Sequence, residues 1–574
     1  MGMMIDEQKT TPFRRRLGDL KVEADSWRAH WAEIQKYICP TRGRYLNDGV
    51  QDQDNKGDKV NEYLMTGLPM RAAKVLASGL QGGLTNPSRP WFHFTPITGR
   101  LGTSKDIKEA LERAQKSLMV ALSVSNFYGA AHSMYLDLAL FGTAAVFVEP
   151  DDRALFRFHA LTPGEYYCAA GPSGFVDTLY RRTTMTTYQI VTRFGVENVT
   201  DGVKREWEEK RFDKRHVVIH AIEPRTDRRE HSKLSTDMAY VSIHFEEAAE
   251  ADKALRESGY NSQPFAVTRW MVTGADVYGR SPGMDVLPDA KQLHKMIEKK
   301  LIAVDKMVDP PMNADPFLKA QGGGSIVPAA INYVPLGRGG PGFTPTMQIQ
   351  PNVYEIGQEI NRIVQDIRQG FYNDIFLATI DETKRMTATE VEQRKTEQMQ
   401  QLGPIALQIQ GDFLDPIIYR CLGIMEDAGV LPPMPEEISQ SPMTVEYLGP
   451  LARAQAMSEI YGLQQFYMFI SQAAATQANS GQAPDVLDKV DTDAMVDQMA
   501  EILDVSQSIV RDDREVEALR EARAQAQQQQ EMIGQAESMS KSAKNLSMAQ
   551  VTEGGSMLDR VSANITERIT GVRQ

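Results

Sequence analysis

The chain has 574 residues, of which 42% are hydrophobic and 24% are charged, and its formal net charge is −13. This length exceeds what one hydrophobic core supports, so about three or four structural units are expected. The acidic balance excludes a protein that coats nucleic acid over its whole surface, although it permits a local basic feature. Three distant cysteines, no signal peptide and no long apolar run predict a soluble intracellular protein with reduced thiols.

The first 283 residues predict a body of mixed helices and strands. Apolar residues at three- or four-residue spacing predict amphipathic helices, and short β-branched or aromatic runs between turn residues predict strands. The predicted helices are Leu17 to Ile38, Val60 to Gly83 and Lys105 to Phe141. The predicted strands are Trp91 to Phe94, Thr143 to Pro150, several runs between Phe156 and Ile222, Tyr240 to Phe245, and Phe265 to Val272.

Two matched amphipathic helices follow this body, Pro288 to Val308 and Val353 to Phe371. Each is about 30 Å long, and each has one apolar stripe. In the first helix the stripe spans an arc of about 80°, and four lysines occupy a similar arc about 200° away. The stripe residues are Leu293, Ile297, Leu301, Val304 and Val308, and the lysines are Lys291, Lys295, Lys299 and Lys306. The pattern predicts a helical hairpin that packs against neighbours.

The connection between these helices, Asp309–Gln350, is rich in glycine and proline. It holds seven prolines and seven glycines in 42 residues, which is far above average usage. Since a structureless loop of this length is unusual inside a compact domain, we expect a small projecting unit.

The remainder of the chain predicts mainly helix. A helical pattern from Thr387 to Ala428 contains Gly403-Pro404 and Pro416, which must kink or interrupt it. From Arg511 onward, Glu, Arg, Ala and Gln dominate and apolar residues are sparse. This tail is therefore either disordered or helical in assembly with copies of itself. Two further predicted helices are Ala452–Ser471 and Val490–Leu503.

The chain carries no recognisable catalytic motif. It lacks GxxxxGK[ST], HExxH, an EF-hand loop and GxSxG. His216 and His220 would share one face of a strand, but without a third ligand two ordinary sheet histidines are preferred over a metal site. For the acidic group Asp488, Asp491 and Asp493, helix-capping acids on a solvated loop are preferred over a carboxylate cluster. We therefore expect no enzyme active site, metal or cofactor.

The lysine face allows two interpretations. Glu298 and Asp305 lie on or beside it, and Lys295 with Glu298 forms an (i, i+3) pair in sequence. By itself, this face is typical of a solvated helix surface, and Lys384-Arg385 is typical of a surface pair. The alternative is a surface that meets a polyanion, which needs support from the rest of the chain.

Four segments carry a joint pattern: KVLASGLQGGLTNPSRPWFHF (Lys74–Phe94), SNFYGAAHSMYLDLALFGTAAVFVEPD (Ser125–Asp151), YGRSPGMDVLPDAKQLHKM (Tyr278–Met296) and MTATEV (Met386–Val391). Together they resemble the head-to-tail connecting (portal) protein family of short-tailed bacteriophages. The segments occur in the order typical of that family and cover roughly residues 60 to 450.

The resemblance implies an α+β multidomain portal fold, mainly α with a β-rich wing, in a subunit that forms a ring, usually of twelve. It assigns 1–283 and the kinked helix 387–445 to the wing, 284–308 and 351–372 to the two stem helices, 309–350 to the clip, 373–386 to the tunnel loop, 446–510 to the crown, and 511–574 to a C-terminal helical barrel or tail.

The implied function is a non-enzymatic conduit for packaging and ejecting double-stranded DNA, at one capsid vertex of the virion, after assembly in the host cytoplasm. The implied partners are the terminase large subunit, the major capsid protein and scaffold, and tail adaptor or tail proteins. In a twelvefold ring each lysine becomes twelve charges that meet phosphates without sequence-specific readout. The DNA-channel candidates are Lys291, Lys295, Lys299, Lys306, Lys384 and Arg385.

Two other functions remain open at this level. One is a nucleic-acid-processing enzyme with an unrecognised site in the β-rich region. The other is a ring-forming tail adaptor without a role in packaging, although adaptors are usually much shorter than 574 residues.

Overall fold

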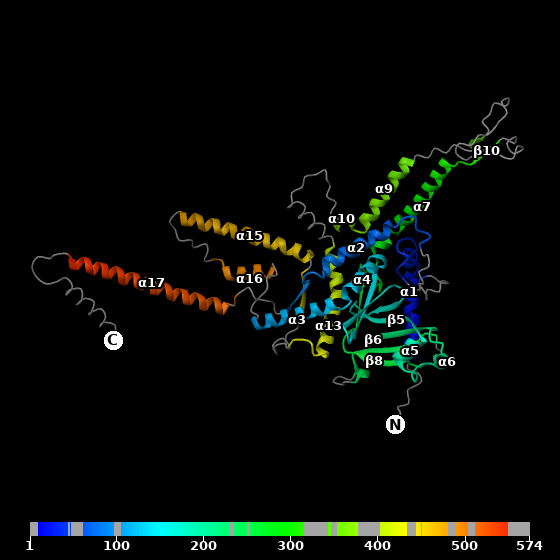
Figure 1. Cartoon of the computed structure of the whole chain (residues 1–574), viewed down its shortest axis with the longest axis horizontal. Helices are drawn as coiled ribbons and strands as arrows, with labels where there is room; N and C mark the ends of the chain where they lie inside the picture. Colours follow the sequence, from blue (N-terminus) through cyan, green and yellow to red (C-terminus); the bar gives the residue numbers. More distant parts are fainter. Residues whose placement is uncertain are drawn as a thin grey trace, which may run out of the picture. The chain divides into compact units, whose positions relative to one another are not determined.

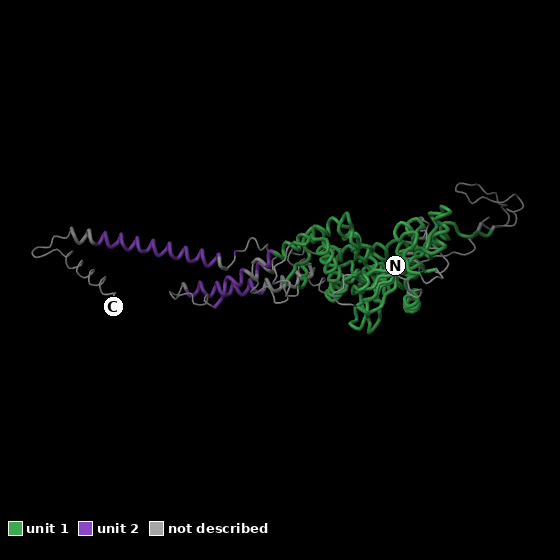
Figure 2. Tube along the Cα trace, turned by 90° about the horizontal axis from the view of Figure 1, so that it is seen from below, with its two compact units in different colours: residues 1–103, 110–459 green, residues 104–109, 460–574 purple. Residues whose placement is uncertain are grey.

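The computed structural model describes residues 10–43, 46, 61–96, 105–228, 234–248, 253–314, 343–345, 353–376, 402–432, 443–448, 450–479, 489–502, 511 and 513–548 (Figure 1). The chain forms two compact units, one of residues 1–103 and 110–459 and one of residues 104–109 and 460–574 (Figure 2). Among the described helices, none combines the length and the apolar character that crossing a membrane requires. All three cysteines are buried free thiols.

Two antiparallel sheets form the centre of the larger unit. In the three-stranded sheet, β2 (Thr143–Asp151) lies between β3 (Leu155–Leu161) and β9 (Phe265–Arg269). The second sheet has the order β4-β5-β6-β7-β8. The strands of that sheet are Tyr166–Ala170, Val176–Thr186, Arg215–Pro224, Tyr240–Glu246 and Arg256–Tyr260. The β-rich region is thus confirmed, whereas β8, whose sequence RESGY has few strand-forming residues, was not predicted.

Helices cover both faces of the five-stranded sheet. On one face, the guanidinium of Arg14 in α1 (Thr11–Tyr37) lies 4.8 Å from the ring centre of Phe245. On the other, α5 (Thr187–Phe194) and α6 (Asp201–Glu208) form a small apolar core with Val218. These two helices were not predicted, because eight residues are too few for a periodic pattern to stand out.

The prediction of one helix from Lys105 to Phe141 was wrong. The structure has two, α3 (Lys105–Val124) and α4 (Phe127–Phe141). The break has a side-chain cause: the Asn126 amide donates to the carbonyl of Phe158 at 2.8 Å and accepts from its N–H at 2.9 Å. Similarly, α2 (Leu68–Leu84) starts at Leu68 rather than at Val60.

The predicted helical hairpin is confirmed as α7 (Pro282–Val308) packed against α9 (Val353–Gly370). Its start was predicted too late, and the two helices are unequal, with 27 and 18 residues. The Ser281 hydroxyl accepts from the N–H of Met284, and Pro282 occupies the first turn, so the helix begins before Pro288.

Beyond the hairpin, part of the Gly/Pro-rich connection forms a small strand pair. β10 (Met312–Ala314) pairs antiparallel with β11 (Phe343–Pro345), and Figure 1 shows β10 past the end of α7. Residues 315–342 and 346–350 of the predicted clip lie outside the described residues, as do Lys384 and Arg385. Of the predicted tunnel loop, the first four residues form α10 (Asn373–Phe376).

The predicted interruption near Gly403 and Pro416 takes the form of a π-helical turn. Pro404 lies in the first turn of α12 (Gly403–Ile409), and Pro416 lies in the first turn of α13 (Asp415–Asp427). Between them, η3 (Gln410–Leu414) widens the helix. The chain therefore stays helical through this segment.

A strand pair that was not predicted joins two distant parts of the larger unit. β1 (Phe92–Pro96) pairs antiparallel with β12 (Met443–Tyr447), and Thr95 donates to the Glu446 carboxylate 351 residues away. The indole of Trp91 stacks on the ring of Tyr447, with centroids 6.4 Å apart. We call the β1–β12 pair the β1–β12 clamp, because the sheets, the hairpin and the kinked helix all lie between its two strands in the sequence.

Three helices dominate the carboxyl-terminal part: α15 (Pro450–Asn479), α16 (Thr492–Ile502) and α17 (Asp513–Met548). The Asp491 carboxylate accepts from the N–H groups of Asp493 and Ala494, which confirms it as a helix cap. Asp493 pairs with Arg520 of α17. Nearly all described side chains of α17 are exposed, including Met532 and Ile533.

Candidate nucleic-acid interface

The half of α7 nearest the body is anchored by buried contacts. The Ser281 hydroxyl donates to the Leu140 carbonyl at 2.7 Å, and Leu293 is fully buried. His294 accepts from the N–H of Met65 through Nδ1 and donates through Nε2 to the carbonyl of Tyr37, both at 3.0 Å. Burial lowers the pKa of His294, which favours this neutral tautomer.

The outer half of α7 exposes large apolar side chains. The predicted stripe is thus divided, since Leu293 is buried whereas Leu301 is 54% and Val308 is 80% exposed. By contrast, Ile363, Ile367 and Phe371 of the α9 stripe are buried. Adjoining apolar side chains on a surface mark a contact site for another protein surface. The other exposed apolar residues of the hairpin are Ile302, Val304, Met307 and Tyr354.

The four stem lysines fall into two groups. Lys295, Lys299 and Lys306 are exposed and form no ion pair with any residue that the structure describes. The Lys291 ammonium instead lies 2.8 Å from the Glu33 carboxylate of α1 and 5.4 Å from the ring centre of Tyr37. The sequence pair Lys295–Glu298 forms no ion pair. Three exposed ammonium groups on one helix can contact phosphates but cannot distinguish bases.

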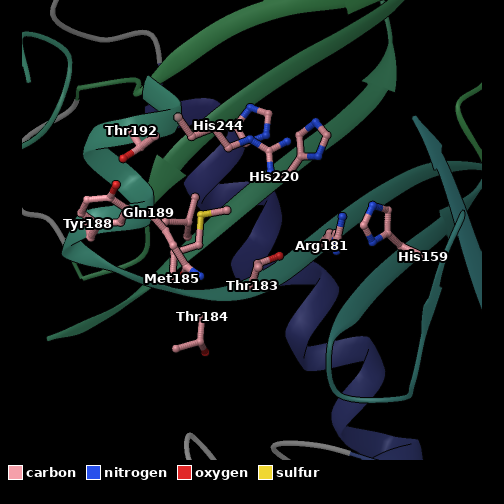
Figure 3. Close-up of a pocket in the computed structure, with 12 residues that line it drawn as sticks. His159, Arg181, Thr183, Thr184, Met185, Tyr188, Gln189, Thr192, His220 and His244 are labelled. Carbon is pink, nitrogen blue, oxygen red and sulfur yellow. The ribbon is translucent and has the colours of Figure 1, made fainter. Parts of the chain in front are cut away.

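His216 and His220, the sequence candidates for metal ligands, occupy separate environments. His220 is buried, its Nε2 lies 2.8 Å from the Ser242 hydroxyl, and its ring stacks on His244 with centroids 3.8 Å apart (Figure 3). Within the described part of the chain, no three His, Cys, Asp or Glu side chains are grouped to hold a metal ion.

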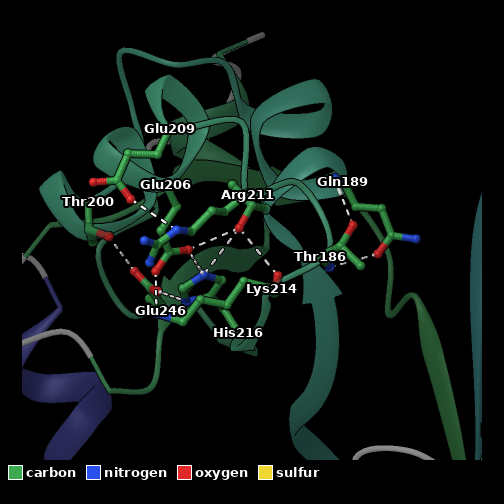
Figure 4. A network of polar contacts seen from close by, with 10 residues as sticks. Thr186, Gln189, Thr200, Glu206, Glu209, Arg211, Lys214, His216 and Glu246 are labelled. Carbon is green, nitrogen blue, oxygen red and sulfur yellow. Dashed lines mark hydrogen bonds and ion pairs between the residues drawn. The ribbon is translucent and has the colours of Figure 1, made fainter.

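His216 lies between two glutamates (Figure 4). Its Nε2 is 2.6 Å from the Glu206 carboxylate and its Nδ1 is 2.8 Å from that of Glu246. Hydrogen bonding to Glu246 and Glu206 raises the pKa of His216. Its hydrogen bonds also lower the pKa values of both glutamates, against the effect of burial. This network connects α6 to β6 and β7 and serves the fold.

Comparison with known proteins supplies the family context. The family described as "Bacteriophage head to tail connecting protein" matches residues 11–510. The chain is 34% identical over 526 residues to a probable portal protein of Bordetella phage BPP-1, covering 92% of this chain and 93% of the relative. It is 32% identical over 541 residues to a portal protein of Salmonella phage epsilon15, covering 94% and 95%.

Two solved structures resemble the chain weakly. The neck of an empty gene transfer agent particle matches with a TM-score of 0.35 and 11% identity, covering 73% of this chain and 91% of that chain. The virion of a native gene transfer agent particle matches with a TM-score of 0.32 and 10% identity, covering 71% and 94%. Similarity at this level supports no functional argument.

Proposed function

Since the chain belongs to the bacteriophage head to tail connecting protein family, it acts as a portal protein, and we propose that twelve copies form a ring at one capsid vertex. In this proposal the two sheets belong to the wing, and α7 with α9 forms the stem. The ring is located in the virion, after assembly in the host cytoplasm with the major capsid protein and scaffold.

The exposed apolar stripe on the outer half of α7 is the observation that carries this proposal. Leu301, Val304 and Val308 of this stripe are each more than a third exposed in the single subunit. Burying an apolar side chain gains roughly 1.5–3 kcal/mol, so a neighbouring subunit would gain by covering them. A ring repeats this contact at every subunit, because each copy presents the same surface.

The channel would then carry double-stranded DNA. Lys295, Lys299 and Lys306 are the stem candidates whose charges are free to meet phosphates, and Lys291 ranks below them because it already pairs with Glu33. Lys384 and Arg385 of the tunnel loop remain candidates. Since a conduit must pass DNA without gripping it, a few cationic rings in an acidic protein suit the task.

The ends of the ring have different partners in this proposal. The clip, which includes the β10–β11 pair, contacts the terminase large subunit during packaging and tail adaptor or tail proteins afterwards. The terminase supplies ATP hydrolysis, and the portal has no catalytic role. The α17 helix assembles with its copies into a C-terminal barrel, which would cover the exposed Met532 and Ile533.

Electron microscopy of the purified full-length protein, viewed along its axis, tests the ring and counts its subunits. We expect rings of twelve with a central channel. A protein that stays monomeric or dimeric under all assembly conditions and cleaves DNA with a metal ion would favour the nucleic-acid-processing enzyme instead. Rings that assemble but are dispensable for packaging would favour the tail adaptor.

Charged substitutions in the apolar stripe test its role in assembly. Changing Leu301 and Val304 to Glu should reduce the ring population at least tenfold, because burying an unpaired carboxylate at a subunit contact costs several kcal/mol. Val22→Glu is the matched control, since Val22 is 73% exposed on α1 of the body. Mass photometry measures the ring fraction. Equal ring fractions for both variants would contradict a subunit contact at α7.

A further inference from the structure

A row of basic side chains crosses the five-stranded sheet. Arg181 of β5 is directly opposite His220 of β6, His220 is opposite His244 of β7, and His244 is opposite Arg256 of β8. Directly opposed residues of an antiparallel pair point to the same face and have neighbouring side chains. The row therefore gathers two arginines and two histidines on one face of the sheet.

This row borders a cavity of about 480 Å³ between the sheet and α5 (Figure 3). Arg181, His220 and His244 line its inner side, while Met185 and Tyr188 lie among the residues around the rest of the wall. The size matches pockets that bind small organic molecules, whose walls are mainly apolar with a few polar groups.

Polar groups of the cavity wall lack hydrogen-bond partners among the described residues. His244 is 7% exposed, and its Nδ1 is enclosed without a hydrogen-bond partner in the part of the chain that the structure describes. The half-buried guanidinium of Arg181 likewise forms no hydrogen bond or ion pair with a described residue, and it lies 5.5 Å from the ring centre of Phe147. A buried polar group without a partner is costly, so the enclosed Nδ1 of His244 favours a ligand that satisfies it. The half-buried guanidinium of Arg181 is available to an anion.

The surrounding charges favour an anion. Three arginines, Arg181, Arg193 and Arg256, contribute positive charge near the two histidines. The acids that interact electrostatically with this group are Glu149 and Glu165. Glu149 already pairs with Arg193 at 3.1 Å. Burial and these arginines lower the pKa values of His220 and His244, so both rings are neutral near pH 7. The net charge at the cavity is positive without a ligand.

We propose that this cavity binds a small organic anion. The phosphate or carboxylate group contacts the Arg181 guanidinium and the imidazole of His244, and the apolar or aromatic body lies against Met185 and Tyr188. The site belongs to the folded wing of a single subunit, so it does not depend on ring formation or on DNA. It is a ligand site within the portal body, separate from the stem lysines.

Calorimetric titration of the full-length protein tests the proposal with defined probes. Phenyl phosphate and benzoate present the two candidate anionic groups on an aromatic body, inorganic phosphate lacks the body, and benzyl alcohol lacks the charge. We expect the better aromatic anion to bind at least about tenfold more tightly than inorganic phosphate, since burying an aromatic body adds apolar contact. Benzyl alcohol should not bind measurably. Comparing phenyl phosphate with benzoate identifies the preferred group.

Variants connect the binding to the row. Arg181→Gln should weaken binding of the aromatic anion by about tenfold or more, because a charge-assisted hydrogen bond is lost. Arg157→Gln is the matched control, since Arg157 lies on β3, is 51% exposed and pairs with Asp151 outside the cavity. His244→Phe keeps the ring shape and removes the nitrogens, so it should also weaken binding. Binding that is equal in all three variants would overturn the proposal.

A direct observation keeps the test decisive if Arg181→Gln folds poorly. Electron microscopy or crystallography of the unmodified protein with sodium tungstate, a heavy phosphate analogue, should show density between Arg181 and His244. An empty cavity at saturating tungstate, together with no calorimetric signal from either aromatic anion, would refute the site.

Discussion

At the scale of single residues, His216 couples the fold to pH. A histidine whose pKa is raised on folding contributes stability that is fully present below its unfolded pKa, near 6.5, and is lost as pH rises through the higher folded value. The contacts with Glu206 and Glu246 should therefore stabilise the packing of α6 on β6 and β7 more at pH 6 than at pH 8.5. Below about pH 4.5 this stabilisation falls again, because the two glutamates, whose pKa values are lowered, become protonated.

His216→Gln tests this dependence. The substitution should lower the free energy of unfolding by about 1–3 kcal/mol at pH 6, since charge-assisted hydrogen bonds are lost, and by less at pH 8.5. His294→Gln is a control with the opposite sign, because burial lowers the pKa of His294 and its contribution falls as pH drops below 6.5. Denaturant unfolding at both pH values measures both effects. Parallel pH profiles for the two variants would contradict the assignment.

The exposed stem lysines carry the DNA prediction. Changing Lys295, Lys299 and Lys306 to Gln should leave ring assembly intact and alter packaging or retention of DNA. The slope of log affinity for duplex DNA against log salt should fall by about 0.9 for each phosphate contact removed. Lys291→Gln should change this slope little, because its ammonium pairs with Glu33. Packaging, retention and salt slope that all match the unmodified ring would exclude these lysines from the channel.

The sequence could predict that the four lysines share one face, but not that Lys291 is paired while the others are exposed. Helical periodicity places Lys291, Lys295 and Lys299 on one side, because that geometry is local. Only the packed structure shows that α1 brings Glu33 and Tyr37 to Lys291. The Arg181–His220–His244–Arg256 row is further out of reach, because it depends on the register of four strands that are separated by loops and helices.

At the scale of elements, the hairpin depends on one close approach. A Cβ atom at Gly370 of α9 would lie 2.3 Å from Cγ2 of Val286 in α7, and Val286 is 2% exposed. The glycine therefore lets the two helices approach at the base of the stem.

Gly370→Ala should destabilise the protein by about 1–3 kcal/mol through overpacking. Adding Val286→Ala should restore part of that loss, because it removes the opposing methyl group. Gly357→Ala on the same helix is the matched control: its nearest neighbour would be the Lys300 ammonium at 3.8 Å, so about 0.5–1 kcal/mol of stabilisation is expected. Thermal unfolding compares the variants. Stabilisation by Gly370→Ala would show that the close approach is relaxed in solution.

Element type was predictable where a pattern extends over many residues. α1, α7 and α9 have clear amphipathic periods, and β2 is an uninterrupted apolar run. The predicted ends of helices were wrong in two situations. In one, a local sequence signal marks the end, and in the other a tertiary contact sets it. Ser281-Pro282 is a helix-start signal that the sequence offered, whereas the break at Asn126 requires the backbone of Phe158.

At the scale of the whole molecule, assembly should not depend on the tail. On the proposed arrangement, in which the wing and the stem supply the main subunit contacts, removing Arg511–Gln574 should still give rings. The stability of α17 should depend on assembly, since its described side chains are almost all exposed in one subunit. Electron microscopy of the truncated protein checks the rings, and circular dichroism of the isolated tail checks its helicity. Collapse of the truncated protein to monomers would contradict this division of roles.

The β1–β12 pair can form only late in the synthesis of the chain. Thr95 meets Glu446 across 351 residues of chain, which a ribosome needs about 20 to 70 s to synthesise at 5–20 residues per second. Throughout that interval the nascent chain presents Trp91 and Phe92 without their partner strand, and the α7–α9 hairpin is synthesised before that strand. The proposed assembly surface of α7 is thus made before β1 and β12 can pair. Chains that associated before β12 is synthesised would therefore do so with β1 still unpaired.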